Sequence, residues 1–280
     1  MRTGFLLLAL FAFVVVALLA AADATWKSRT AEYVIRLDST ALQPRDSLFK
    51  PAMLEDLPAP VARYLRAALR DSVPLLWHAV IRHKGQFRPD PARRDWWTFD
   101  SVQHFDARPP GFVWDARMDM APGVKVFVRD ALIGEEGSVL ARLAGIFPVA
   151  QSRGAGDLGA ASLQRWLAET AWFPTALLPG QSVTWTAIDD STARASTGAG
   201  NTTVSLDFHF GADSLVSYID TDARARLVKG VSVGTPWRGT WTAWDWYEGM
   251  RIPTRGEVEW ELPAGPFPYW RGTLEGATYE

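Results

Sequence analysis

The sequence predicts a mainly β protein of the α+β class, in which a large curved antiparallel meander sheet or half-barrel packs against two helices. Apolar and polar residues alternate with period two in most segments after Trp77, as expected for strands with one buried face. The turns between these segments are too short for the crossover helices that parallel pairing requires. After the N-terminal leader, helical spacing occurs near residues 56–70 and 157–173, which we expect to be the two packed helices.

The composition describes a globular chain without a nucleic-acid partner. Of the 280 residues, 48% are hydrophobic and 21% are charged, and the net charge of -2 gives no field that would attract nucleic acid. The 14 Trp and 14 Phe are an aromatic excess that suits a wide core, an apolar pocket or a membrane interface. The chain has no cysteine, which excludes disulfides, a thiol nucleophile, thiolate metal ligands and a lipid-modified cysteine anchor.

The N-terminus carries an export segment. Residues 4–22 are uncharged, follow Arg2 and run into the A-x-A site Ala22-Asp23-Ala24. Residues 1–24 are therefore a signal peptide or an N-terminal membrane anchor, because a length of ~19 residues lies at the border between the two. Either interpretation predicts an exported protein, periplasmic or anchored to the membrane by this segment. Residues 25–54 follow as a linker or a first strand, with Tyr33, Ile35 and Leu37 on one side of that strand.

We expect residues 55–280 to form a single antiparallel β domain. Its first helix, near 56–70, shows an apolar stripe made by Val61, Tyr64, Leu65 and Ala68. Strands with period-two alternation follow from Trp77 to about residue 150 and from about Val183 to the C-terminus. The tetrad W-R-G-T occurs at 237–240 and 270–273, and we interpret the two copies as similar strands, each with a glycine that allows a bend or a close approach.

The segment Ser162–Pro179, between the two runs of strands, predicts a helix that plugs or covers the sheet. Leu163, Trp166, Leu167 and Ala171 form its apolar face, and Pro174 ends it. Arg165 and Glu169 lie four residues apart on another face, where their side chains can form an ion pair. The pair is either structural or part of a site.

No motif assigns a reaction, so the catalytic residues stay unknown. Histidines are absent from helical H-x-x-x-H pairs, and the nucleophile elbow G-x-S-x-G and the phosphate-binding loop are also missing. We therefore expect no cofactor and no metal, although a metal site built from histidines on different strands stays open. Carboxylates that can supply an acid/base pair are Asp115, Asp119, Asp130, Glu135, Glu136 and Glu169.

We expect an apolar ligand to contact residues of the central helix and of the strands that face it. On the helix and the turn after it these residues are Glu169, Arg165, Trp166, Trp172 and Phe173. On the strands they are Trp114, His83 and Asp130. Packing of helix on sheet is the alternative role for the aromatic members of this set.

Four groups of residues give the chain a family resemblance. They are His83-x-Gly85-x-Phe87-Arg88, Pro109-Pro110-Gly111-Phe112-x-Trp114-x-Ala116, Asp130 with Gly134 and Gly137, and the run R-W-L-A-E-T-A-W-F-P-T-A-L-L-P at 165–179. With these residues the chain resembles, over about residues 55–275, an uncharacterised bacterial family of exported or membrane-anchored proteins with a domain of unknown function. Trp166 departs from the family pattern, which has tyrosine there. The architecture is also similar to that of periplasmic lipoprotein-carrier proteins, which implies a curved sheet around an apolar cavity.

The leading functional hypothesis is an envelope protein that binds or presents an apolar ligand, such as a lipid or an acyl chain, in a cavity between sheet and helix. One alternative is an enzyme acting on an envelope lipid or sugar, with Glu169, Asp130, Asp115 or His83 as acid or base. Another is a purely structural envelope protein with a solid core. The expected partners are the apolar ligand and, through the N-terminal segment, a membrane.

Overall fold

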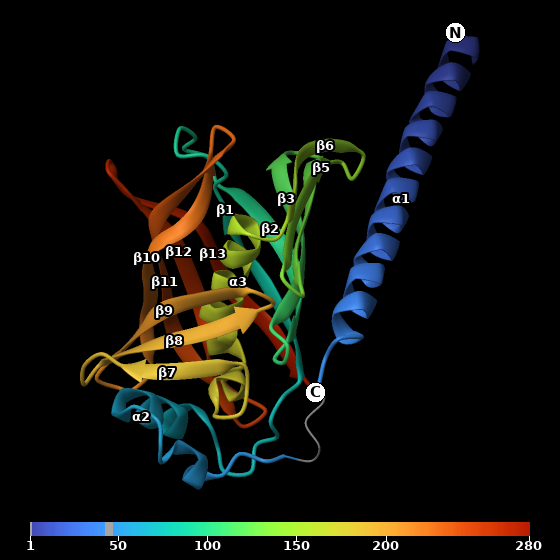
Figure 1. Ribbon diagram of the computed structural model, residues 1–280. Coiled ribbons are helices and arrows are strands. Elements are labelled where there is room, and N and C mark those ends of the chain that lie inside the picture. Colours follow the sequence, from blue (N-terminus) through green and yellow to red (C-terminus); the bar gives the residue numbers. More distant parts are fainter. Residues whose placement is uncertain (1, 43–46) are drawn as a thin grey trace.

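A computed structural model describes residues 2–42 and 47–280 and shows one 13-stranded antiparallel sheet with helices on both of its faces (Figure 1). The helices are α1 (Arg2–Asp38), α2 (Ala59–Ala68) and α3 (Asp157–Glu169), with short 3-10 helices η1 (Pro51–Leu54), η2 (Thr170–Trp172) and η3 (Pro174–Leu177). The strands of the first half are β1 (His78–Phe87), β2 (Trp97–Asp106), β3 (Gly111–Ala121), β4 (Val124–Ile133), β5 (Glu136–Leu143) and β6 (Phe147–Gly154). Those of the second half are β7 (Val183–Ala187), β8 (Thr192–Ala199), β9 (Thr202–Phe210), β10 (Val216–Val228), β11 (Val231–Tyr247), β12 (Met250–Leu262) and β13 (Gly265–Tyr279).

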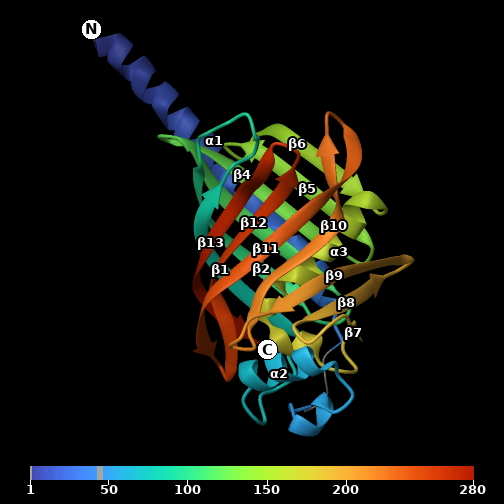
Figure 2. The ribbon, with the colours of Figure 1, turned by 90° about the vertical axis from the view of Figure 1, so that its left-hand side faces the viewer.

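Each half is a meander, and the two halves join where β13 pairs with β1. The strand order is β6-β5-β4-β3-β2-β1-β13-β12-β11-β10-β9-β8-β7, so β6 and β7 are the sheet edges. Figure 2 shows β13, β12, β11 and β10 side by side and strongly tilted. The prediction of a mainly β protein with a curved antiparallel meander or half-barrel is confirmed, and α1 is a third helix besides the two that were expected.

The hairpin turns define an upper end of the sheet, which is at the top in Figure 1. Consecutive strands are antiparallel, so alternate turns of each meander lie at the same end. The turns at the upper end are β1–β2 (88–96), β3–β4 (122–123), β5–β6 (144–146), β10–β11 (229–230) and β12–β13 (263–264). The helix α2 closes the lower end, where buried Tyr64 packs on Phe210 and Trp244.

A row of three glycines crosses the middle of the sheet. Gly256 of β12, Gly272 of β13 and Gly85 of β1 are neighbours in the strand register. A Cβ atom added to Gly256 would lie 2.5 Å from the ring of Trp241, and one added to Gly272 would lie 2.5 Å from the ring of Trp270. Aromatic rings thus lie directly on bare backbone, an arrangement that permits sharp bending of a sheet.

The helix α3 lies in the concavity of this sheet, between its two halves (Figure 1). Two buried indoles tie the helical segment to both halves. The Trp166 N–H donates to the Asp106 carbonyl at the end of β2 (2.9 Å), and the Trp172 N–H donates to the Pro253 carbonyl of β12 (3.1 Å). Because the unpaired N–H group of a buried indole is costly, these two bonds fix both the position and the rotation of the segment.

The expectation of a linker or a first strand over residues 25–54 was wrong for residues 25–38, because these residues continue α1. Leu37 is 1% exposed whereas Ile35 is 67% exposed, so they do not share a face as they would in a strand. The buried face follows helical spacing through Trp26, Thr30, Tyr33 and Leu37 and packs on the outer side of β3 and β4. The segment up to α2 contains η1, and residues 43–46 of the expected linker lie outside the described residues.

We predict that Gly256→Ala lowers the free energy of unfolding by about 1–3 kcal/mol, because the new methyl group displaces the Trp241 ring in an already packed core. Urea unfolding of the full chain in detergent micelles measures this. Gly276→Ala on β13 is the matched control, since a Cβ atom there meets nothing within 4 Å. Equal stabilities of the two variants would contradict this role for the glycine row.

Candidate functional site

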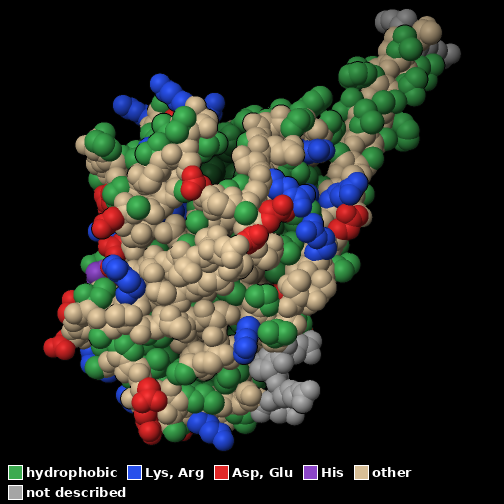
Figure 3. Space-filling model, in the orientation of Figure 1, with side chains coloured by type: hydrophobic (Ala, Val, Ile, Leu, Met, Phe, Trp, Pro, Cys, Tyr) green, Lys and Arg blue, Asp and Glu red, His purple; other side chains and the backbone are tan. Residues whose placement is uncertain are grey.

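A cavity of about 290 Å³ lies between α3 and the concave face of the sheet. Its lining comes from α3 and from strands of both halves, and the surface is hollowed at the upper end, where Leu227 of β10 lines the cavity (Figure 3). Most of the wall is aromatic or aliphatic: Phe87, Phe112, Trp114, Val139, Leu158, Trp172, Trp237, Trp241, Val258, Trp260, Tyr269 and Trp270. An apolar concavity with few polar groups is the usual form of a small-molecule site.

The tryptophans of the wall hold one another in place. Trp172 packs edge-on against Trp241, with ring centroids 4.8 Å apart, and against Trp270 at 6.2 Å. In the same wall, Trp260 stacks on Tyr269 at 5.7 Å. Such pairs add about 0.5–1.5 kcal/mol each beyond the area that they bury, so these contacts stabilise the wall.

A polar cluster around Arg165 interrupts the apolar wall. The guanidinium of this α3 residue donates to Glu169 Oε1 (3.0 Å) and to Asp130 Oδ2 of β4 (2.9 Å). Gln103 of β2 donates to Glu169 Oε2 (2.7 Å), and the guanidinium lies over the Trp114 ring at 4.9 Å. The cluster therefore joins α3 to β2 and β4 by charge-assisted hydrogen bonds, and to β3 by the contact of the guanidinium with the Trp114 ring. The predicted ion pair between Arg165 and Glu169 is present in the structure.

Asp130 is the member of this cluster with unused hydrogen-bonding capacity. Its Oδ1 atom is buried and has no hydrogen-bond partner among residues 2–42 and 47–280. Burial raises the pKa of the Asp130 carboxyl, and the neighbouring Glu169 raises it further, while Arg165 opposes both effects. A ligand that donates a hydrogen bond would satisfy this oxygen.

Two further arginines line the cavity from β10. Arg224 donates to the Ala161 carbonyl (3.1 Å) and to the Tyr269 hydroxyl (3.2 Å), and its guanidinium lies 5.2 Å from the Trp237 ring. Arg226 lies over the Trp260 ring at 5.8 Å. Neither forms an ion pair with any carboxylate in the described part of the chain. Both cations are therefore open to an anionic ligand group.

The sequence prediction missed Arg224 and Arg226. A signal was present in the spacing R-A-R, which places both side chains on the same face of one strand. The strand is tilted and changes register between Thr221 and Arg224, so its inward face could not be assigned from alternation alone.

Five of the eight predicted ligand residues line the cavity together: Arg165, Glu169, Trp172, Trp114 and Asp130. They come from α3, η2, β3 and β4, and the sheet curvature brings them into one site.

The other three predicted ligand residues lie outside the cavity wall. Trp166 is fully buried on a different face of α3, one residue and about 100° around the helix from Arg165. Phe173 packs on Phe105, with ring centroids 4.7 Å apart. His83 packs against Trp172 at 4.4 Å, and burial lowers its pKa to about 3, so its imidazole is neutral at physiological pH.

A separate cluster lies at the lower end, where α1 meets the sheet. His78 Nδ1 lies 2.8 Å from Asp106 Oδ1 and 3.4 Å from Asp38 Oδ1, and the ligand atoms of the three residues lie within 4.8 Å of one another. These three could hold a cation. The expectation of no metal stays a prediction.

The fold and the cavity define the class of this protein: a half-barrel with a helix in its concavity and an apolar pocket between the two. The chain belongs to the Family of unknown function (DUF6920), whose family model matches residues 55–279, and the resemblance found in the sequence is thereby confirmed.

Among solved structures, the chain is similar to a LolA superfamily protein, NE2245 from Nitrosomonas europaea, with 10% identity, a TM-score of 0.37 and coverage of 77% of this chain and 91% of that one. It is also similar to a beta-barrel-like protein of domain of unknown function DUF1849 from Brucella abortus, with 12% identity, a TM-score of 0.25 and coverage of 74% and 99%. Likenesses at these TM-scores support no conclusion about the ligand. No curated protein matches the chain in sequence.

We predict that Asp130→Asn makes the free energy of unfolding less sensitive to rising pH. The folded-state pKa of Asp130 is raised above 3.8, so the folded protein binds this proton more tightly than the unfolded chain. The contribution of Asp130 to stability is therefore fully present below about pH 3.8 and is lost as the pH rises through the folded-state pKa. The free energy of unfolding of Asp130→Asn, relative to wild type, should increase between pH 4 and pH 7 by about 1.4 kcal/mol for each unit of the pKa shift.

Urea unfolding at a series of pH values measures this difference. Asp100→Asn on the exposed outer face of β2 serves as the control for loss of a carboxylate outside the cavity. A pH-independent difference between wild type and Asp130→Asn would show that Asp130 titrates as it does in the unfolded chain.

Proposed function

We propose that this protein binds an apolar ligand with a single chain, such as an acyl chain or one chain of a lipid, in the cavity between α3 and the sheet. The main support for this proposal is the cavity itself, whose wall is built from tryptophan, phenylalanine and aliphatic side chains. The aromatic excess of the sequence is thus partly explained by a binding surface.

The size of the cavity supports a single chain. A volume of about 290 Å³ lies at the lower limit for ligand pockets, which range over about 300–1,000 Å³. Each buried methylene group contributes about 0.8 kcal/mol, so a chain of about ten would gain ~8 kcal/mol before the cost of ordering it. A chain of this length can therefore bind through apolar contacts alone.

The charges in the cavity support an anionic head group. Arg224 and Arg226 lie on the same strand as the rim residue Leu227, and neither forms an ion pair with a described carboxylate. Guanidinium groups bind carboxylate and phosphate in a bidentate manner. A fatty acid or a phospholipid with its chain inside and its head group at these arginines satisfies both parts of the site.

The two alternatives have less support. A solid core, expected of a purely structural protein, does not agree with the cavity. Of the four acid/base candidates for an enzyme, Glu169 and Asp130 share the cavity, and both are bound by Arg165. Asp115 lies on the outer face, bonded to Trp26 and Thr30, and His83 lies behind Trp172.

We predict that Val258→Trp weakens binding of a fluorescent fatty acid to the delipidated protein by about tenfold or more, because the added ring fills the cavity. Fluorescence titration measures the dissociation constant. Glu257→Trp places the same ring on the outer face of the same strand, away from the cavity, and should bind as wild type does. The proposal fails if delipidated wild type does not bind the probe and organic extraction of the purified protein releases no lipid.

A further inference from the structure

The helix α1 packs along the outer face of β3 and β4. Leu37 packs on Val113 and Ala131, near the lower ends of β3 and β4. Trp26, farther up, packs on Phe127 at 5.6 Å. Ala22 lies beside the β5–β6 turn, since a Cβ atom on Gly145 would be 3.6 Å from its methyl group. From its C-terminal end to its N-terminal end, the helix therefore runs along the outer face of the sheet toward the upper end. Its N-terminal part projects beyond that end (Figure 1).

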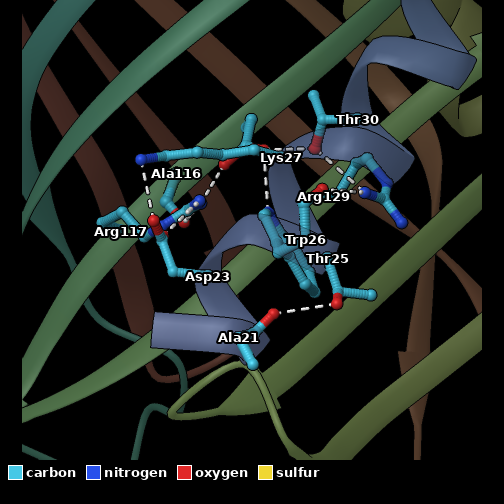
Figure 4. A network of polar contacts seen from close by, with 10 residues as sticks. Ala21, Asp23, Thr25, Trp26, Lys27, Thr30, Ala116, Arg117 and Arg129 are labelled. Atoms are coloured by element: carbon cyan, nitrogen blue, oxygen red, sulfur yellow. Dashed lines mark hydrogen bonds and ion pairs between the residues drawn. The ribbon is translucent and has the colours of Figure 1, made fainter. Parts of the chain in front are cut away.

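Polar contacts fix α1 rigidly to the sheet (Figure 4). The Trp26 indole N–H donates to Asp115 Oδ2 (2.8 Å), and Thr30 Oγ1 accepts from Arg129 (2.9 Å). Asp23 lies 3.6 Å from Arg117 of β3 and also pairs with Lys27 within α1 itself (2.7 Å). The helix is continuous through Ala22-Asp23-Ala24, so cleavage there requires local unfolding of a docked segment.

The projecting part of α1 is long and apolar enough to cross a bilayer. Residues 3–22 carry no charge, and 20 helical residues rise about 30 Å, the thickness of a hydrocarbon core. Their large side chains are exposed, among them Phe5 (74%) and Phe13 (70%). Because the uncharged stretch ends beside the β5–β6 turn, a membrane around residues 3–22 would have its surface at the upper end of the domain.

The upper end has the surface chemistry expected of such a position. Outside α1, ten large hydrophobic side chains of the described residues are exposed, and six of them lie at the upper end: Met120, Phe147, Val149, Leu227, Val231 and Val233. The five upper turns carry four basic residues and two acidic ones, although the chain has a net charge of -2. Figure 3 shows basic groups at the top of the molecule. Apolar tips among basic residues suit an anionic membrane surface.

We propose that α1 is retained as a membrane anchor and that the upper end of the domain rests on the bilayer surface, with the mouth of the cavity facing the lipid. The anchor then orients the domain as well as tethering it, because α1 is docked along β3 and β4. If the cavity binds a chain-bearing ligand as proposed above, the bilayer is the source from which it enters.

Single-cysteine labelling tests this orientation, since the chain has no cysteine of its own. An environment-sensitive fluorophore is placed at Phe147→Cys or Val231→Cys at the upper end, and at Ile188→Cys or Trp246→Cys as exposed apolar controls elsewhere. The full chain is reconstituted in vesicles of phosphatidylcholine and phosphatidylglycerol. The upper labels should show blue-shifted emission and quenching by nitroxide-bearing lipids, and the control labels neither. Equal, water-like emission at all four positions would overturn the proposal.

Three further measurements separate the parts of the proposal. The intact mass of protein isolated from membranes should include residues 1–24, and their loss would overturn retention of the anchor. Trp26→Ala should loosen the docking of α1 and reduce the contrast between upper and control labels. Val258→Trp should weaken fatty-acid binding about tenfold or more while leaving that contrast intact, so a failure of the proposed ligand and a failure of the proposed orientation give different results.

Discussion

The close packing of aromatic rings on bare backbone is the constraint on which this structure depends. Gly256, Gly272 and Gly85 leave no side chain between the sheet and the rings of Trp241 and Trp270. A sheet of thirteen strands tends to curl, split or flatten, and here a glycine row at the junction of its two halves permits the curl. The helix α3 then fits into the concavity without filling it, and the remaining space is the cavity.

The polar groups of the cavity are of two kinds with different consequences. Arg165 is neutralised by Glu169 and Asp130, so this cluster mainly fixes α3 against the first half of the sheet. Removing one partner of a buried ion pair leaves the other charge uncompensated, so the three side chains of this cluster depend on one another. Arg224 and Arg226, on the second half, have aromatic and neutral partners, and their charge remains available. One set of charged side chains in the cavity thus binds α3 to the sheet, and a second set can bind a ligand.

The fold was predictable because it follows from local patterns. Period-two alternation and short turns gave the antiparallel meander, and the spacing of Arg165 and Glu169 gave their ion pair. The candidate site was predicted only in part, because contacts across the curved sheet have no local signal. Trp166 and Trp172 look alike in the sequence, but only the second lines the cavity. Residues 26–37 were expected to be a linker or a strand, and the prediction was wrong because their buried face contacts the outer side of β3 and β4, which depends on how α1 docks.

Native mass spectrometry of the full-length protein released from its own membranes tests whether the cavity holds a chain-bearing ligand taken from the membrane. We expect a species heavier than the bare chain by one anionic lipid or fatty acid, which organic extraction removes and identifies. A spectrum with only the bare chain, from preparations in which the protein is folded and membrane lipids are abundant, would contradict it.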